Sequence, residues 1–210
     1  MTHHRRRNNG TDPSKINETV ELSPAQRYAA FKQTQAKQRT VAAEFARSMP
    51  FELDEFQMQA NDALEAGDNV LVAAPTGAGK TVAADFAIYL AQTRNVKAFY
   101  TTPIKALSNQ KYHDLVDQYG TDKVGLLTGD TSINSEADIV VMTTEVLRNM
   151  LYEHSVTLEA LRYVILDEVH YLADRFRGPV WEEVIIHLPK NVNIIGLSAT
   201  VSNVEDFSEW

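Results

Sequence analysis

The chain has 210 residues, a formal net charge of −8 and a sequence pI of about 5.2, and 44% of its residues are hydrophobic. This size suits one globular domain with a short extension, and the acidic balance argues against nucleic-acid binding driven by global charge. The absence of cysteine excludes disulfides, thiolate zinc sites and a cysteine nucleophile. With no secretory signal pattern and no apolar run near the roughly 20 residues of a membrane span, we expect a cytoplasmic protein without membrane contact.

The N-terminal part of the chain reads as a tail followed by a helix. Residues 1–22 are polar, and we expect them to be disordered. Ser23 can cap a helix, Pro24 suits the first turn, and Gln26 completes a capping-box pattern. We therefore predict a helix from Ser23 to about Arg47 within an N-terminal helical extension, residues 23–48, and a main domain over residues 49–210.

The main domain alternates short apolar runs with amphipathic segments. We predict buried strands at 70–73, 97–101, 124–127, 139–142, 164–166 and 194–197, and helices at 82–92, 105–119, 145–152 and 180–188. Strand-helix alternation predicts an α/β fold in which a parallel sheet is covered by helices on both faces. Ligands of such sheets bind beyond the carboxyl ends of the strands.

A glycine-containing loop follows the first predicted strand, and it has the strand-loop-helix context of a phosphate-binding loop. Backbone N–H groups of such a loop point at phosphate oxygens, aided by the dipole of the following helix. Two glycines permit close approach, the lysine reaches the outer phosphates, and the threonine hydroxyl binds magnesium. Alanine stands where the usual pattern has its first glycine; the alternative interpretation is an ordinary glycine turn. The candidate nucleotide-binding residues are Ala74, Pro75, Thr76, Gly77, Ala78, Gly79, Lys80 and Thr81.

A second motif, Asp-Glu-Val-His, begins at Asp167, directly after the predicted strand 164–166. An aspartate at a strand end beside a phosphate loop can bind Mg²⁺. Glu168 is then placed to orient and deprotonate the water that attacks the γ-phosphate, and His170 to hydrogen-bond to another motif and report nucleotide state. A solvated strand end is the alternative. No His-Glu-x-x-His zinc pattern is present, and Ser198 lacks the second glycine of a nucleophile elbow.

With these motifs in the same order, residues 50–210 resemble the DExH-box helicases of superfamily 2, and more narrowly the superkiller-type RNA helicases, including their actinobacterial branch. The resemblance implies a RecA-like P-loop NTPase fold that uses ATP and Mg²⁺. It implies that Phe51 stacks on adenine and Gln57 reads the edge of the base. It also implies that Ser198 and Thr200, in Ser-Ala-Thr, couple hydrolysis to strand movement. Residues 171–183 resemble the family segment that follows Asp-Glu-Val-His.

Segments 102–111, 127–130 and 143–148 resemble the family's strand-contacting motifs. Their hydroxyls, backbone amides and isolated basic groups suit phosphate contacts without base readout. Capping of helices and turns is the alternative, and the same groups can serve both roles. The candidate nucleic-acid contacts are Pro103, Lys105, Ser108, Thr128, Gly129, Thr144 and Arg148.

The resemblance implies an ATP-dependent helicase motor that acts on single-stranded nucleic acid, with RNA favoured over DNA. Superfamily 2 helicases use a second RecA-like domain, which supplies arginines to the ATP site. We expect this chain to be the first motor domain of a longer helicase, weak in hydrolysis alone. A DExH DNA helicase and a non-catalytic nucleotide- or RNA-binding regulatory module are the alternatives.

Overall fold

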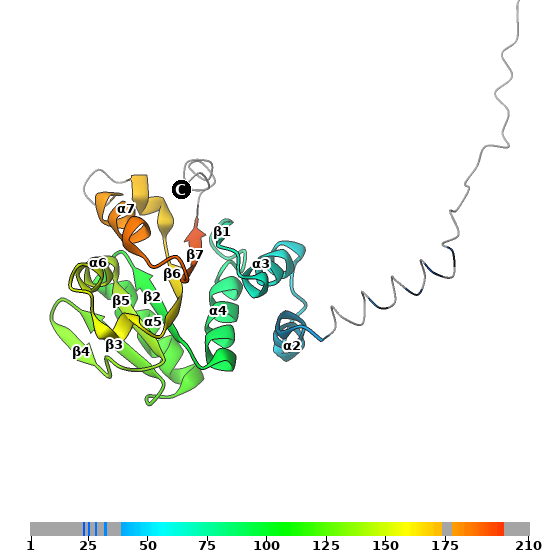
Figure 1. The fold of residues 1–210 in the computed structure, drawn as a ribbon, viewed down its shortest axis with the longest axis horizontal. Coiled ribbons are helices and arrows are strands. Elements are labelled where there is room, and N and C mark those ends of the chain that lie inside the picture. The colour runs from blue at the N-terminus through cyan, green and yellow to red at the C-terminus, as the bar shows by residue number, and fades with distance from the viewer. Residues whose placement is uncertain are drawn as a thin grey trace, which may run out of the picture. The chain divides into compact units, whose positions relative to one another are not determined.

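The computed structural model describes residues 39–173 and 178–199, together with Ser23, Ala25, Tyr28 and Lys32. Within these residues, the sheet has the strands β1 (Val70–Ala73), β2 (Lys97–Thr102), β3 (Val124–Thr128), β4 (Thr131–Ile133), β5 (Ile139–Thr143), β6 (Leu161–Leu166) and β7 (Asn193–Ser198). Their spatial order is β1-β7-β6-β2-β5-β3-β4 (Figure 1). In this spatial order, each pair of adjacent strands from β1 through to β3 is parallel, and β4 pairs antiparallel with β3.

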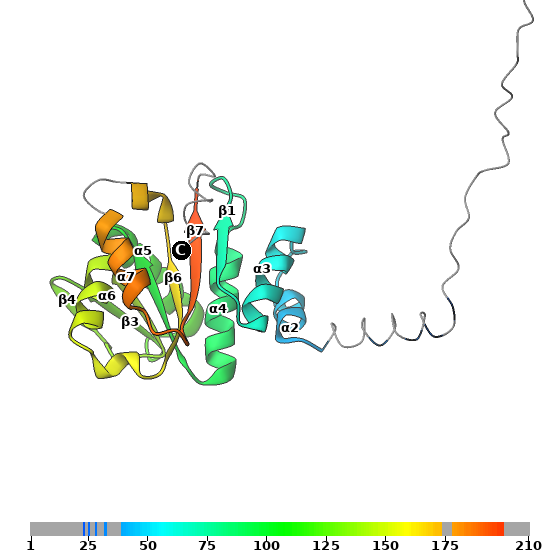
Figure 2. The ribbon, with the colours of Figure 1, turned by 45° about the horizontal axis from the view of Figure 1, so that its top comes forward.

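Helices cover both faces of this sheet. The α-helices are α2 (Val41–Ser48), α3 (Glu55–Ala66), α4 (Thr81–Arg94), α5 (Lys105–Tyr119), α6 (Thr144–Tyr152) and α7 (Gly178–His187), and short 3₁₀ helices span Val156–Leu158 and Val169–Ala173. Helices α4 and α5 pack on one face, and α6 and α7 pack together on the other. Figure 2 shows α3 beside α4 at the β1 end of the sheet, with α2 next to it.

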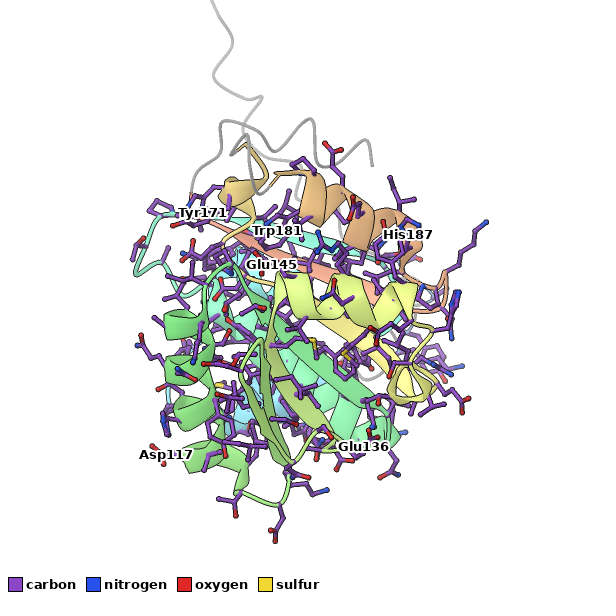
Figure 3. The ribbon with its side chains drawn as sticks, turned by 90° about the vertical axis from the view of Figure 1, so that its left-hand side faces the viewer. Asp117, Glu136, Glu145, Tyr171, Trp181 and His187 are labelled. Atoms are coloured by element: carbon purple, nitrogen blue, oxygen red, sulfur yellow. The ribbon has the colours of Figure 1, made fainter. Side chains whose placement is uncertain are left out.

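Two apolar cores lie on opposite sides of the sheet because successive strand side chains point to opposite faces. On β2, Tyr100 belongs to the core under α4 and α5, and Phe99 belongs to the core under α6 and α7. The second core includes Trp181 of α7, the largest fully buried side chain of the described residues (Figure 3). Packing on both faces thus fixes the positions of the parallel strands, and the predicted motifs lie at the carboxyl ends of these strands.

The structure confirms the six predicted strands to within a few residues at their ends, and the four predicted helices likewise. Besides the two short 3₁₀ helices, two elements were not predicted. Strand β4 has three residues, mostly exposed, and it pairs antiparallel with β3 at the end of the otherwise parallel sheet. Helix α3 overlaps the segment 51–57 that was interpreted only as a base-binding motif.

The prediction of one continuous helix from Ser23 to about Arg47 is wrong, because the chain is not helical at Arg39 and Thr40. Ala25, Tyr28 and Lys32 are helical, but Arg39 lies in a turn and α2 starts anew at Val41. The Thr40 hydroxyl caps this helix by accepting the N–H of Ala43 at 3.1 Å. The compact unit that contains the sheet begins at Thr40.

Residues 1–22 lie outside the described part, so their disorder stays a prediction. No helix among the described residues is long and apolar enough to cross a membrane.

Candidate nucleotide site and nucleic-acid surface

The predicted phosphate loop connects the end of β1 to the start of α4. Ala78 N–H donates to the Pro75 carbonyl at 3.1 Å, and Val82 N–H donates to the Gly79 carbonyl at 3.2 Å, so the loop closes directly onto the first turn of α4. Gly77 has φ +86° and Gly79 has φ +77°, a left-handed conformation that glycine adopts without steric cost. The N-terminal N–H groups of a helix attract anions, so this loop can hold phosphates.

Gln57 connects the phosphate loop to α3. Its Nε2 donates to the Gly79 carbonyl at 3.0 Å, and its Oε1 accepts the Asp54 N–H at 2.9 Å. A Cβ atom on residue 79 would lie 2.5 Å from the Gln57 Nε2, so any larger residue would displace the Gln57 amide besides straining the positive φ angle. The Gln57 amide keeps one further N–H and one further lone pair, and its adenine contact stays a prediction.

Three further candidate residues lie before α3 or at the start of α4: Phe51, Lys80 and Thr81. Phe51 precedes α3 and is 51% exposed, and its stacking on adenine stays a prediction. Lys80 is buried at the base of the loop, and Thr81, the first residue of α4, is exposed. The phosphate contact of Lys80 and the magnesium contact of Thr81 stay predictions.

Asp167 lies two strands away from the loop, directly after β6, and three hydrogen bonds fix it. Its N–H donates to the Thr101 carbonyl at 3.0 Å. Its Oδ2 accepts the Tyr100 hydroxyl at 2.7 Å, and its Oδ1 accepts the Glu168 N–H at 2.9 Å. Burial and the nearby negative charge of Asp167 raise the pKa of Tyr100 well above that of an ordinary phenol, so the hydroxyl remains a donor.

Glu168 adopts φ +57°, a left-handed conformation that costs free energy for a residue with a Cβ and often marks functional sites. Its Oε2 lies 3.1 Å from His170 Nδ1, although neither atom has a well-aligned hydrogen bond among the described residues. The His170 ring also packs on Tyr171, with ring centroids 4.7 Å apart. His170 therefore touches the proposed water-orienting carboxylate of its own motif, and its contact with another motif stays a prediction.

The chemistry of these side chains fits Mg²⁺. Thr81 and Asp167 offer hard oxygen ligands, which this ion prefers. The described residues contain no group of three or more His, Cys, Asp or Glu that could hold a metal by themselves. Magnesium commonly binds through one or two protein oxygens together with water and substrate phosphates, so the side chains present suit an ion that arrives with a nucleotide.

Ser198 ends β7, between the strands that carry the two motifs. Its carbonyl accepts the Ala74 N–H at 3.1 Å, and it is the register partner of Ala73. The Ser-Ala-Thr segment thus starts in direct backbone contact with the phosphate loop. Thr200 lies outside the described residues.

The candidate nucleic-acid residues divide into buried and exposed groups. Ser108 and Thr144 are buried: the Ser108 Oγ lies 2.7 Å from Thr102 Oγ1, and the Thr144 hydroxyl donates to the Thr102 carbonyl at 3.3 Å. Pro103 is also buried, and Gly129 is exposed. The Arg148 Nε lies 3.7 Å from Glu183 of α7. For Ser108 and Thr144 these contacts with Thr102 favour the alternative, in which the hydroxyls cap helices and turns.

Lys105 and Thr128 converge on one carboxylate that the sequence analysis did not select. Asp130 Oδ2 lies 2.5 Å from Lys105 Nζ, and its Oδ1 accepts the Thr128 hydroxyl at 3.0 Å. Hydrogen bonds from Lys105 and Thr128 lower the pKa of Asp130. Lys105 and Thr128, two predicted phosphate contacts, are therefore both bound to the carboxylate of Asp130. The position of Asp130 directly after Thr-Gly was the available sequence signal, but its partner Lys105 lies 25 residues earlier in the sequence.

Comparison with known proteins agrees with these motifs. The model of the DEAD/DEAH box helicase family matches residues 54–207. The probable helicase HelY of Mycobacterium tuberculosis is 62% identical over 166 residues, which cover 79% of this chain and 18% of HelY. The antiviral helicase SKI2 of Saccharomyces cerevisiae is 53% identical over 165 residues, which cover 79% of this chain and 13% of SKI2.

A solved structure of Mycobacterium smegmatis helicase Lhr, bound to ssDNA and AMP-PNP, superposes with a TM-score of 0.60 at 31% identity. It covers 77% of this chain and 24% of Lhr. The predicted RecA-like α/β fold is thereby confirmed. The chain spans less than a fifth of the length of the curated relatives described above. From the family match and these identities, the chain belongs to the DEAD/DEAH box helicase family.

Proposed function

We propose that this chain is the first motor domain of an ATP-dependent DExH-box RNA helicase, which moves along RNA when joined to a second RecA-like domain. One observation carries the proposal: the phosphate loop follows β1, Asp167 and Glu168 follow β6, and only β7 lies between these two strands. Parallel strands lie about 4.8 Å apart, so the two motifs sit roughly 10 Å apart at one edge of the sheet. That spacing suits a γ-phosphate and its metal ion between them.

Different residues of the chain have different roles at the proposed ATP site. Loop N–H groups and Lys80 bind the phosphates, and Thr81 and Asp167 hold Mg²⁺. A bound Mg²⁺ ion supplies positive charge that neutralises the developing charge on the phosphate oxygens. Glu168 orients the attacking water and accepts its proton. Phe51 and Gln57 hold the adenine ring.

Nucleic acid is proposed to bind at the carboxyl ends of β2, β3 and β5, where the candidate contacts described above lie. Because the chain carries a net charge of −8, binding depends on local contacts with the nucleic-acid backbone. The Ser198 carbonyl contacts the phosphate loop through Ala74 N–H, which supports a coupling role for the segment from Ser198 to Thr200. We extend the proposal to a cytoplasmic location.

RNA is proposed as the substrate because of the resemblance to superkiller-type RNA helicases. A DNA substrate is the second candidate, since Lhr was solved with ssDNA. ATPase assays of the protein joined to its second motor domain, with matched single strands of RNA and DNA, separate them. Greater stimulation by RNA supports the proposal, and stimulation by DNA alone contradicts it. Fast RNA-stimulated turnover by the 210-residue chain alone would contradict the need for a second domain.

A further inference from the structure

Tyr100 makes a side-chain contact with the magnesium side of the proposed site, and nothing described above gives it a role in the reaction. It lies on β2 and is the register partner of Ile165 on β6, two residues before Asp167. Its side chain is fully buried, yet its hydroxyl ends 2.7 Å from Asp167 Oδ2. A buried phenol requires a hydrogen-bond partner, and here the partner is the proposed magnesium ligand.

The contact restrains the orientation of the Asp167 carboxylate. One oxygen accepts the Tyr100 hydroxyl, and the other accepts the Glu168 N–H at 2.9 Å. Each oxygen keeps a further lone pair, so both remain able to bind a metal ion or its water. Partners of this kind fix the rotamer of a metal ligand, and their loss typically costs about 10- to 100-fold in metal affinity or activity.

The Tyr100 ring is held in turn by the two helices that pack on its face of the sheet. Lys111 Nζ of α5 lies 4.9 Å from the ring centroid, within the range of a cation–π interaction. Lys111 also interacts with Asp85 of α4: burial raises the pKa of Asp85, and the positive charge of Lys111 opposes this shift. Helix α4 begins at the phosphate loop and α5 begins at Lys105, so the ring lies between elements of both proposed ligand surfaces.

We propose that Tyr100 is a positioning residue that holds the Asp167 carboxylate for Mg²⁺. This inference rests on the proposed ATP site but adds a residue to it. The hydroxyl of Tyr100, and not only the bulk of its ring, determines how tightly Mg²⁺ binds at the nucleotide.

The test is a titration of the 210-residue chain with a fluorescent ATP analogue, first in EDTA and then at increasing Mg²⁺. Tyr100→Phe removes only the hydroxyl. Tyr163→Phe is the matched control, because Tyr163 is a buried tyrosine on the neighbouring strand whose hydroxyl contacts Arg94 and not Asp167. We expect Tyr100→Phe to raise the half-saturating Mg²⁺ concentration about 10-fold or more, with unchanged binding in EDTA. Tyr163→Phe should match the wild type.

Equal Mg²⁺ dependence in the wild type and Tyr100→Phe would overturn the inference while leaving the ATP site intact. Failure of the wild type to bind nucleotide would instead overturn the proposed function. A double-mutant cycle tests the route through the carboxylate. In an Asp167→Asn background, Tyr100→Phe should add nothing to the Mg²⁺ dependence, and an undiminished effect there would also overturn the inference. Binding in EDTA reports directly whether each variant is folded.

Discussion

At the scale of single residues, Gln57 and Gly79 form one structural unit. Sequence analysis selected both residues, but for separate roles, at the base and at the phosphates. The structure joins them by the Gln57 Nε2 to Gly79 carbonyl hydrogen bond, and the missing Cβ of Gly79 makes room for the amide. The first turn of α3 therefore sets the shape of the phosphate loop, and changes at either residue should affect nucleotide binding.

Gly79→Ala should weaken ATP binding by at least about 10-fold, since it adds a clash with Gln57 to a strained positive φ, which costs about 1–3 kcal/mol. Gly67→Ala is the matched control. Gly67 also has a positive φ, of +97°, but nothing lies within 4 Å of its added Cβ. Calorimetric titration of ATP would measure both variants. Unchanged affinity in Gly79→Ala would show that the loop does not need this close approach.

Asp130 gives a second prediction at this scale. The ion pair of Asp130 with Lys105 is exposed, so it stabilises the fold little, and the carboxylate repels a phosphate that approaches Lys105 and Thr128. Asp130→Asn should therefore tighten binding of single-stranded RNA about two- to fivefold and make it more salt-dependent. Asp138→Asn is the matched control, because Asp138 pairs with Lys123 in another exposed ion pair, just before the amino ends of β3 and β5. Weaker binding by Asp130→Asn would indicate that the carboxylate orients Lys105 rather than competing with RNA.

At the scale of elements, the start of α2 depends on a residue from α3. The two carboxylate oxygens of Glu65 accept the N–H groups of Val41 and Ala42 at 2.9 and 2.8 Å, which satisfies two of the N–H groups that a helix start leaves unpaired. Phe45 then packs on Phe86 and Tyr89 of α4, with ring centroids 5.1 and 5.4 Å away. This tertiary contact explains why the helix restarts at Val41.

Glu65→Ala should lower the free energy of unfolding by about 0.5–2 kcal/mol, the range for loss of a helix cap. Glu52→Ala, at an exposed position before α3, should change it little. Urea denaturation followed by circular dichroism measures both. Equal stability of the two variants would mean that Thr40 alone is sufficient to start α2.

The same elements show what the sequence can and cannot predict. Buried strands such as 139–142 were found because parallel strands covered on both faces form continuous apolar runs. Strand β4 was missed because three mostly exposed residues carry no such run. The contacts of Glu65, Tyr100 and Asp130 join residues 23 to 67 positions apart. They depend on strand order and helix packing, which local patterns do not encode.

At the scale of the whole molecule, the strand order brings distant motifs to one edge of the sheet. The phosphate loop and Asp167 are 86 or more residues apart in sequence, but β7 alone separates their strands. The predicted nucleic-acid residues follow β2, β3 and β5 at the same edge. A single sheet thus carries both proposed ligand surfaces, and Tyr100 and Lys111 contact each other between them.

Calorimetric titration of ATP with Mg²⁺ tests most directly whether the phosphate loop of this chain binds ATP. Lys80→Ala should abolish measurable binding, because it removes the charge placed for the outer phosphates. Lys190→Ala, an exposed lysine at the opposite edge of the sheet, should bind as the wild type does. Equal affinity of the wild type and Lys80→Ala would contradict the account.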